Sequence, residues 1–399
     1  MQDAEIPKPT ASFALFGYGF RPFFLLAGGY AVLSIAVWAA VFMWGRALPS
    51  DLPPSLWHAH EMLFGFSVAA AAGFLMTAVP SWTGTPRVSG APLAVLVIIW
   101  LAGRVAFWMD GSLSPVAVAI IDMAFIPALI AAIAGPIIGS GQKRNFLFPG
   151  FLLIGVMANG FFHAEALGWT EDTASWSLRL TIYVFVLMVA LIGGRITPRF
   201  TANALKASDP EIDVRSDPRV EKAVILSMIA AIAADLAGAP PTLSGALALA
   251  AAIALGFRMR HWHTARTLDD PIVWVLHLGH AWVPFAFACK AAADIAGWLP
   301  ADAALHAFTT GAIGTTVLAV MTRAGLGHTG RPLLAPKPVV TAYLLVTVAA
   351  LARIFGPVLT DDLLMWVVVP AGLWIAAFGM FTFVFAPILI GPRPDGKPG

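Results

Sequence analysis

The chain has 399 residues, of which 59% are hydrophobic and only 12% are charged, with a formal net charge of +2. Soluble proteins carry roughly 25% charged and 45–50% apolar residues, so this composition excludes a soluble enzyme, a nucleic-acid-binding protein and a disordered tail. The single cysteine, Cys289, excludes a disulfide within the chain, a CxxC redox motif, a thiolate zinc site and covalently attached c-type haem. The sequence therefore predicts a polytopic membrane protein.

Twelve apolar runs follow one another, each long enough for a helix to cross a hydrocarbon core of ~30 Å, which needs roughly 20 residues. The first 21 residues lack the pattern of a cleaved signal peptide. We expect one all-α integral-membrane domain over residues 1–399, with helices 1–6 in about 22–197, a polar cytoplasmic loop at 198–222 and helices 7–12 in about 219–390. The twelve expected helices lie approximately at 22–44, 57–80, 91–109, 114–138, 146–168, 176–197, 219–238, 243–258, 272–297, 302–322, 338–356 and 364–390.

Basic residues are distributed very unevenly between the two sides of these helices. The N-terminal segment and every second connection hold 19 of the 24 Lys and Arg residues, whereas the opposite connections hold only Arg46. Cytoplasmic loops of membrane proteins carry an excess of Lys and Arg. We therefore expect both termini in the cytoplasm and an even number of crossings.

Histidines are concentrated within the expected membrane spans. Six of the nine lie there, and intramembrane ionisable residues are costly enough to suggest a function. With a rise of ~1.5 Å per residue, four of them lie on the outer side, roughly 9–15 Å from the midplane, so they could converge on one site. The other two lie in the inner half and suit a separate site. The outer four are His58, His60, His163 and His306, and the inner two are His277 and His280.

The spacing of these histidines limits which of them can share a metal ion. On a helix, His58 and His60 point ~200° apart, so they serve two sites or bracket the start of the helix. His277 and His280 share one face, and Gly279 between them leaves room for a flat macrocycle. Neutral imidazole is the commonest metal ligand, and haem iron and copper both accept it. The alternative is that each histidine only donates an interhelical hydrogen bond, worth ~0.6 kcal/mol on average.

Carboxylates accompany the outer histidines. Glu61 follows His60 directly, and Glu165 lies at the outer end of the fifth expected helix. Each could orient a ligand by accepting its ring N–H, or carry protons to a reaction site. For Asp122 and Asp235, which also lie within spans, an interhelical hydrogen bond is favoured over a relay role.

A short internal similarity links the second and tenth expected helices. Two sets of residues match at a constant offset of 246, unless the match is chance in a Gly- and Ala-rich chain. If it is real, both helices present a histidine at the same depth, and we expect His60 and His306 to hold the same metal or adjacent ones. The first set is His60, Gly65, Thr83, Gly84 and Pro86, and the second is His306, Gly311, Thr329, Gly330 and Pro332.

Several long motifs resemble the NnrS family of membrane proteins. The resemblance spans residues ~15–390, in the register that the hydropathy gives. The matching motifs are Trp57–Phe66 (WHAHEMLFGF), Gly73–Pro80 with Trp82–Gly84, Gly193–Arg195 with Pro198 and Phe200–Thr201, Leu276–Gly279 with Ala281–Trp282, His306–Phe308 with Gly311–Gly314, and Met321–Arg323 with Gly327–Pro332.

The resemblance implies a bacterial inner-membrane protein of about twelve helices that contains haem and copper and is linked to nitric oxide metabolism and tolerance during denitrification. His163 lies in a segment that matches less closely, and at His280 the family has an aromatic residue more often. The residues at the family's histidine positions are His58, His60, His277, His306 and His328.

Two functional hypotheses follow. In the first, the protein reduces nitric oxide, 2 NO + 2 e⁻ + 2 H⁺ → N₂O + H₂O, at non-covalently bound haem b, with copper or a second iron and with electrons from quinol or a redox partner. Glu61 or Glu165 delivers protons, and His277 with His280 holds the second metal. In the second, it senses nitric oxide or handles or transports haem, copper or an iron–nitrosyl species without turnover. The outer-site ligands in the first hypothesis are His58, His60, His163 and His306.

Overall fold

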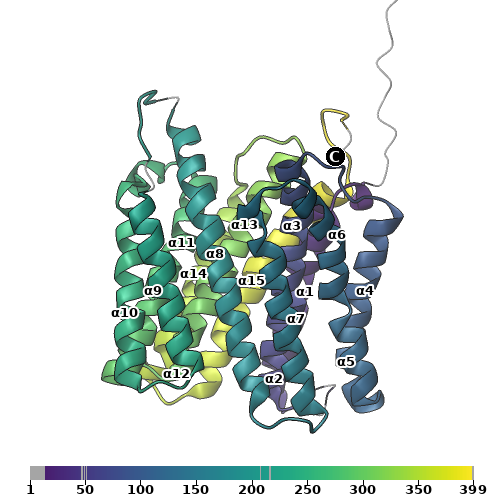
Figure 1. Ribbon diagram of the computed structural model, residues 1–399, viewed down its shortest axis with the longest axis vertical. Helices are drawn as coiled ribbons and strands as arrows, with labels where there is room; N and C mark the ends of the chain where they lie inside the picture. Colours follow the sequence, from purple (N-terminus) through teal and green to yellow (C-terminus); the bar gives the residue numbers. More distant parts are fainter. Residues whose placement is uncertain are drawn as a thin grey trace, which may run out of the picture.

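The computed structural model describes residues 14–45, 48, 50, 52–206, 208–214 and 217–397. Within these residues the chain is helical and contains no strand, which confirms the all-α prediction. Eleven helical segments of the described chain are long and apolar enough to span a membrane. Figure 1 shows the long helices standing side by side in one bundle. The chain is therefore a multi-pass membrane protein.

The spanning segments are of two kinds, continuous and composite. The continuous helices are α1 (Phe20–Trp44), α4 (Ala91–Trp108), α7 (Leu147–Ala166), α8 (Thr173–Leu205), α10 (Pro241–Arg258), α14 (Lys337–Leu359) and α15 (Leu363–Ile390). The composite ones join α2 (Pro54–His60), η2 (Glu61–Ser67) and α3 (Val68–Thr83); α5 (Pro115–Met123) and α6 (Phe125–Gly139); α11 (Pro271–Ala291) and η7 (Ala292–Ala296); and α12 (Ala301–His306), η8 (Ala307–Gly314) and α13 (Thr315–His328). The expected helix ends at 197 and 322 are too early, because α8 and α13 continue to Leu205 and His328.

The seventh expected helix, at 219–238, is not among the eleven apolar spans, but the residues form the helix α9 (Pro218–Leu236), which packs along α10. The two described ends of the chain meet at one face, where the backbone N–H of Ala14 donates to the carbonyl of Ile390 over 2.9 Å. An even number of crossings is needed for this, which supports counting α9 as the twelfth. It is absent from the eleven apolar spans because it carries charged residues near both ends: Arg219, Glu221, Lys222 and Asp235.

We call the face that carries the described ends the terminal face, and the one where α2 and α12 begin the opposite face (Figure 1). The cytoplasmic assignment of the terminal face stays a prediction. Of the basic residues on which it depends, Lys8, Arg46 and Arg215 lie outside the described residues.

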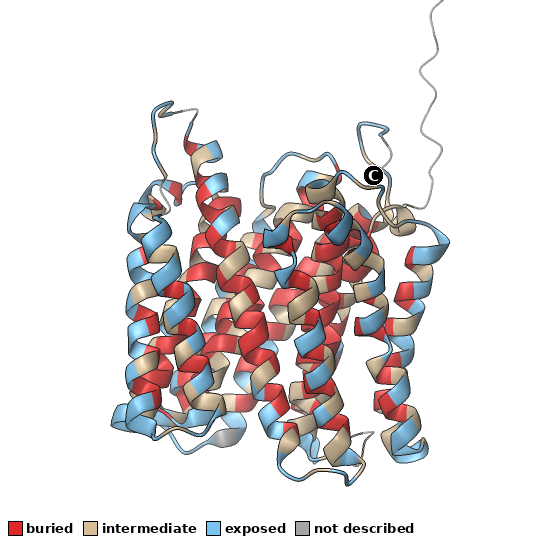
Figure 2. Ribbon diagram, viewed as in Figure 1, coloured by how far each residue is buried: buried red, intermediate tan, exposed pale blue. Residues whose placement is uncertain are grey.

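Hydrophobic side chains cover the outside of the bundle as well as its interior. In Figure 2 buried residues follow the inward sides of the helices and exposed residues the outward sides. Large apolar side chains lie on the outside, among them Phe383 at 84% exposure and Ile120 at 67%. Such a surface is unfavourable in water, but a lipid environment is as apolar as these side chains.

Two π-helical segments give the internal similarity a structural counterpart. The segment η2 begins directly after His60, and η8 begins directly after His306. Single-turn π-helical irregularities inside longer helices are often found at functional sites. The two histidines therefore occupy the same place in two helices with the same irregularity.

The matched glycines also behave alike. A Cβ atom at Gly65 would lie 2.5 Å from the Tyr30 ring, and one at Gly311 would lie 2.4 Å from the Trp282 ring, so an aromatic side chain packs on both backbones. Gly84 and Gly330 both have a φ of +70°, which favours glycine. These shared features argue against chance as the origin of the repeat.

Candidate functional site

A cavity of about 450 Å³ lies between the helices near the opposite face. Cofactor sites are typically concave and mostly apolar, with a few placed polar groups. This cavity has that character, because leucine, isoleucine, phenylalanine and tryptophan side chains form much of its wall. Its polar lining includes His58, Arg179, Asp302, His306 and Arg353.

The His306 ring is oriented by the backbone of its own helix. Its Nδ1 lies 2.6 Å from the carbonyl oxygen of Asp302. A carbonyl oxygen only accepts hydrogen bonds, so Nδ1 carries the hydrogen and Nε2 carries a lone pair. Metal-binding histidines commonly have this arrangement, in which a backbone carbonyl fixes the tautomer. His306 is therefore prepared to be a ligand through Nε2.

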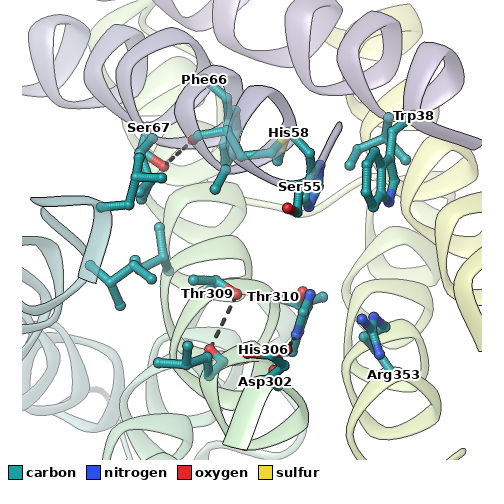
Figure 3. Close-up of a pocket in the computed structure, with 18 of the residues that line it drawn as sticks. Trp38, Ser55, His58, Phe66, Ser67, Asp302, His306, Thr309, Thr310 and Arg353 are labelled. Atoms are coloured by element: carbon teal, nitrogen blue, oxygen red, sulfur yellow. Dashed lines mark hydrogen bonds between the residues drawn. The ribbon is translucent and has the colours of Figure 1, made fainter. Parts of the chain in front are cut away.

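His58 faces the same cavity from α2. Figure 3 shows His58 and His306 on opposite sides of the open space. The His58 ring stacks on Trp38, with 4.5 Å between ring centroids and an interplanar angle of 15°. Its Nδ1 is buried and has no hydrogen-bond partner among the described residues. A buried polar atom without a partner needs an explanation, and a bound group in the cavity would provide one.

Two arginines add positive charge to the cavity wall. Arg353 lies at its edge in Figure 3 and makes no ion pair within the part of the chain that the structure describes. Arg179 lies 3.7 Å from an Asp235 carboxylate oxygen, and 43% of its side chain is exposed. The cavity thus combines ligand-capable imidazoles with guanidinium groups that suit an anionic substituent.

A second group of polar side chains is buried on the side of α2 that faces α4, α5 and α7. None of its members is more than 6% exposed. Arg104 forms ion pairs with both Glu61 and Asp122, and Glu61 also accepts the indole N–H of Trp108 over 2.9 Å. We call this group the buried cluster; its members are His60, Glu61, Arg104, Asp122, Asn159 and His163.

One carboxylate oxygen of Asp122 organises the histidines of the buried cluster. It lies 2.8 Å from His163 Nε2, 3.3 Å from His60 Nε2 and 2.8 Å from Asn159 Nδ2. His60 Nδ1 lies 3.3 Å from a Glu61 oxygen. Both ring nitrogens of His60 thus face acceptors, so this ring has a place for a second proton. Every charged group of the cluster has a partner, as buried ion pairs require.

The buried cluster also meets the distance requirement for a metal site. Ligand atoms of His60, Asp122 and His163 all lie within 4.8 Å of one another. Imidazole and carboxylate are ligand types that iron, copper and zinc accept. The guanidinium of Arg104 on Asp122 already balances part of the negative charge that a cation would otherwise balance.

The four outer histidines therefore divide into two groups rather than converging. His58 and His306 line the cavity, whereas His60 and His163 lie in the buried cluster. His60 and His306 therefore do not lie in one group as ligands of the same metal would, and the expectation that they hold adjacent metals stays a prediction. Residues two positions apart on an α-helix point ~200° apart, which directs His58 toward the cavity and His60 away from it.

A comparison with protein-family models gives one match, described as NnrS protein, which covers residues 14–393. The chain belongs to the NnrS family. None of the curated proteins compared with the chain matches it. Membership fits a membrane protein of nitric oxide metabolism, and the motifs that suggested the family lie in the spans described above.

The two inner histidines of this NnrS chain contact different residues. His277 hydrogen-bonds to Thr201 through Nε2 over 2.8 Å and to Thr264 through Nδ1 over 2.9 Å. His280 is buried against Trp262, with 4.6 Å between ring centroids, and neither of its ring nitrogens has a partner among the described residues. The two rings therefore do not share a ligand environment.

The glycines near these histidines allow close helix packing rather than a macrocycle. A Cβ at Gly279 would lie 2.7 Å from Thr316 Oγ1, so α11 and α13 approach each other there. A Cβ at Gly193 would lie 2.7 Å from His280 Nδ1, and one at Gly194 would overlap the Arg258 guanidinium. The NnrS motif at 193–195 thus makes space for side chains of α10 and α11.

Two expected site residues lie away from both groups. Glu165 accepts the backbone N–H of Ala174 over 2.7 Å and so satisfies a donor in the first turn of α8. His328 packs against Tyr18 and Phe20 at the terminal face, with ring centroids 5.7 and 5.6 Å apart. Neither residue lines the cavity or belongs to the buried cluster.

The sequence reasoning missed the partners of the buried cluster. Arg104 is not among the candidate residues of the sequence analysis, which favours an interhelical hydrogen bond for Asp122. Two opposite charges within neighbouring spans are a signal of pairing in a membrane. The carboxylate of Asp122 does make interhelical hydrogen bonds, but to two histidine rings as well as to Asn159.

Proposed function

We propose that this protein binds haem b non-covalently in the cavity and reduces nitric oxide to N₂O there, in the bacterial inner membrane. The observation that carries the proposal is the pair of imidazoles on opposite sides of the cavity, His58 with an unpartnered Nδ1 and His306 with a free Nε2. Bound haem would supply an iron that binds nitric oxide and accepts electrons.

The other residues of the cavity fit a haem group. The apolar wall, which includes Phe66, Ile313 and Trp374, suits a flat hydrophobic ring. Arg353 and Arg179 offer donors to carboxylate substituents at its edge. Cys289 is the only cysteine and is buried, so covalent attachment is excluded and acidified acetone should strip the haem completely.

The surroundings also suit the substrate. Nitric oxide is a small neutral gas that partitions into lipid, and an apolar cavity excludes competing ions. Joining two molecules, 2 NO + 2 e⁻ + 2 H⁺ → N₂O + H₂O, needs two electrons and two protons. Electrons come from quinol or a redox partner in this proposal.

The buried cluster is the proposed source of protons. His60 has acceptors at both ring nitrogens, and Glu61 and Asp122 share the guanidinium of Arg104. The cluster can therefore hold an additional proton without leaving an unpaired buried charge. Helix α2 carries His58 on the cavity side and His60 on the cluster side, which keeps the two groups adjacent. Glu61 is the general acid that we would test first.

A second candidate function is binding without turnover. The convergence of His60, Asp122 and His163 within 4.8 Å favours a protein that holds copper or iron there, and such a protein could sense nitric oxide or handle haem, copper or an iron–nitrosyl species. Metal analysis of the purified full-length chain separates the candidates, because this reading requires a non-haem metal in stoichiometric amount.

The deciding experiment is gas analysis with the purified full-length protein, a chemical reductant and nitric oxide. Many molecules of N₂O per protein, with a haem b spectrum, support the reductase. A spectrum that shifts with nitric oxide, but without N₂O production, supports binding only. A protein that copurifies with no haem and gains none on reconstitution contradicts the proposal.

A further inference from the structure

Arginines gather at the terminal face, far from the cavity. We call this group the arginine cluster; it consists of Arg21, Arg87, Arg331 and Arg393. Arg21 lies at the start of α1, Arg87 lies 5.0 Å from the centre of the Tyr18 ring, and Arg331 and Arg393 follow the ends of α13 and α15. The four come from segments distant in sequence, so the fold itself brings them together.

Arg21 is fully buried, with 0% exposure, and only part of its guanidinium is satisfied. Its Nη1 donates to the carbonyl of Leu389 over 2.8 Å and to that of Gly391 over 2.7 Å, at the end of α15. Its Nε and Nη2 are buried without a hydrogen-bond partner among the described residues. Leaving a buried charged donor unpaired costs more than leaving a neutral one.

Aromatic rings and a histidine connect Arg21 to its neighbours. The Arg21 guanidinium lies 5.6 Å from the centre of the Phe20 ring, and that ring packs against His328. The carbonyl of His328 accepts from Arg393 Nη1 over 2.8 Å. Arg331 follows in the next turn of the chain, and its Nη1 is also buried without a partner in the described chain.

One acidic side chain of the described chain makes an ion pair with this group. Asp395 binds Arg393 through two hydrogen bonds of 2.8 and 2.6 Å. The Arg393 guanidinium holds the pKa of the Asp395 carboxyl well below its usual range, so this carboxylate stays ionised and engaged with Arg393. Arg21 Nε and Nη2 and Arg331 Nη1 have no hydrogen-bond partner among the described residues.

We propose that Arg21 and Arg331 form a binding site for a phosphate-class anion, either the headgroup phosphate of an anionic phospholipid or free inorganic phosphate. Arginine is suited to this role because its planar fork presents several N–H donors to phosphate oxygens. The partly exposed Arg331 provides access, and the buried Arg21 provides the donors at the base. The site is independent of the proposed haem chemistry.

The test compares anion binding by the full-length protein and an Arg331→Gln variant. Native mass spectrometry measures retention of phosphatidylglycerol against phosphatidylcholine, and thermal unfolding measures stabilisation by inorganic phosphate at constant ionic strength. We expect Arg331→Gln to weaken binding by about tenfold, since one charge-assisted interaction is lost. The matched control is Arg266→Gln, which removes an arginine from an exposed pair with Asp209 and should leave binding unchanged.

The two arms distinguish the sources of the anion. Preferential retention of phosphatidylglycerol that Arg331→Gln weakens identifies a lipid headgroup, and phosphate stabilisation that the variant loses identifies free phosphate. Arg331→Lys keeps the positive charge but loses the planar guanidinium. Its affinity for the anion should therefore lie between the affinities of the wild type and of Arg331→Gln. Equal behaviour of wild type and Arg331→Gln in both arms would overturn the proposal, as would equal weakening by Arg266→Gln.

Discussion

The cavity and the buried cluster lie on two sides of the same short helix, α2, yet their histidines differ in how many hydrogen-bond partners the protein provides. In the cavity, His58 Nδ1 has no partner in the described chain, and the His306 ring presents a free Nε2. In the cluster, His60 has an acceptor within 3.3 Å of each ring nitrogen. The cavity therefore leaves a histidine nitrogen without a protein partner, whereas both His60 nitrogens have one, and in the cluster Arg104 Nε is the atom left without a partner among the described residues.

This difference distinguishes the proposed ligand-binding region from the proposed proton donor better than residue type does. Both regions contain two histidines and charged side chains within the membrane, so composition alone does not distinguish them. Buried polar groups in proteins are nearly always hydrogen-bonded. A histidine whose partners are all protein groups needs no ligand, whereas one that faces a cavity with a free nitrogen does.

The largest effect on haem content should come from removing the His306 ring. We expect His306→Ala to lower the haem content by about tenfold or more. Even substitutions of residues that only hydrogen-bond to a metal ligand lower metal affinity about 10–100-fold. The folding cost is small, about 1–2 kcal/mol for one polar interaction in a membrane, so the variant should still purify. The measurement is the haem-to-protein ratio from a pyridine haemochrome.

His261→Ala, an exposed histidine in the connection after α10, is the matched control for this change. His60→Ala is the comparison across α2 and should keep the haem. If His60→Ala loses haem while His306→Ala retains it, the roles of the two regions are reversed.

Breaking the ion pairs of the buried cluster should have the largest effect on stability, rather than on haem affinity. Arg104→Leu leaves Glu61 and Asp122 buried without their guanidinium, and removing one partner of a buried pair costs about 3–5 kcal/mol. Thermal unfolding of the purified protein measures it. Arg266→Gln, at an exposed pair, should cost about 0–1 kcal/mol. If both variants lost a similar amount of stability, the ion pairs of Arg104 with Glu61 and Asp122 would not contribute more than an exposed pair does.

The proposed proton donor predicts a change in turnover without a change in binding. Glu61→Gln should lower N₂O production by about 10²-fold, the lower end of general-acid contributions, and leave the haem spectrum intact. Glu165→Gln is the control, because Glu165 accepts a backbone N–H at the start of α8 and lies outside the cluster. Full turnover by Glu61→Gln would exclude this residue as the donor.

The smallest effect is expected at the inner histidines. His277→Ala removes a ring whose two nitrogens are bonded to Thr201 and Thr264. We expect a stability loss of about 1 kcal/mol, because each of the two hydrogen bonds contributes about 0.6 kcal/mol on average, with haem and metal content unchanged. Loss of a metal in this variant, measured by elemental analysis, would restore the expectation of a second metal near the terminal face.

The sequence predicted the fold well because the bilayer imposes a simple rule on it. Each crossing needs about 20 apolar residues, and hydropathy alone therefore located the eleven apolar spans. The rule fails at α9, whose four charged residues make its status ambiguous until the chain ends are seen to meet at one face.

The sequence predicted how far along their helices the site residues lie, but not the direction in which their side chains point. Counting residues along a helix placed His58, His60 and His306 near the same level, and the structure brings His58 and His306 to one cavity. Which ring faces which neighbour depends on packing between helices distant in sequence, as with Arg104 between Glu61 and Asp122. Gly279 was misinterpreted for the same reason, since the side chain that fills its space, Thr316, belongs to another helix.

The π-helical segment after His60 has a further consequence for how this protein tolerates changes in length. An α-helix turns ~100° per residue, and a π-helical turn holds one residue more than an α-helical turn. Removing that extra residue from η2 would make the turn α-helical and leave the direction of α2 relative to α3 nearly unchanged. Removing a residue from a regular α-helical turn would instead rotate α2 by about 100°, so that His58 would leave the cavity and His60 would leave Asp122. We therefore expect η2 to tolerate a single-residue deletion better than the regular turns on either side of it, and η8 after His306 to behave in the same way.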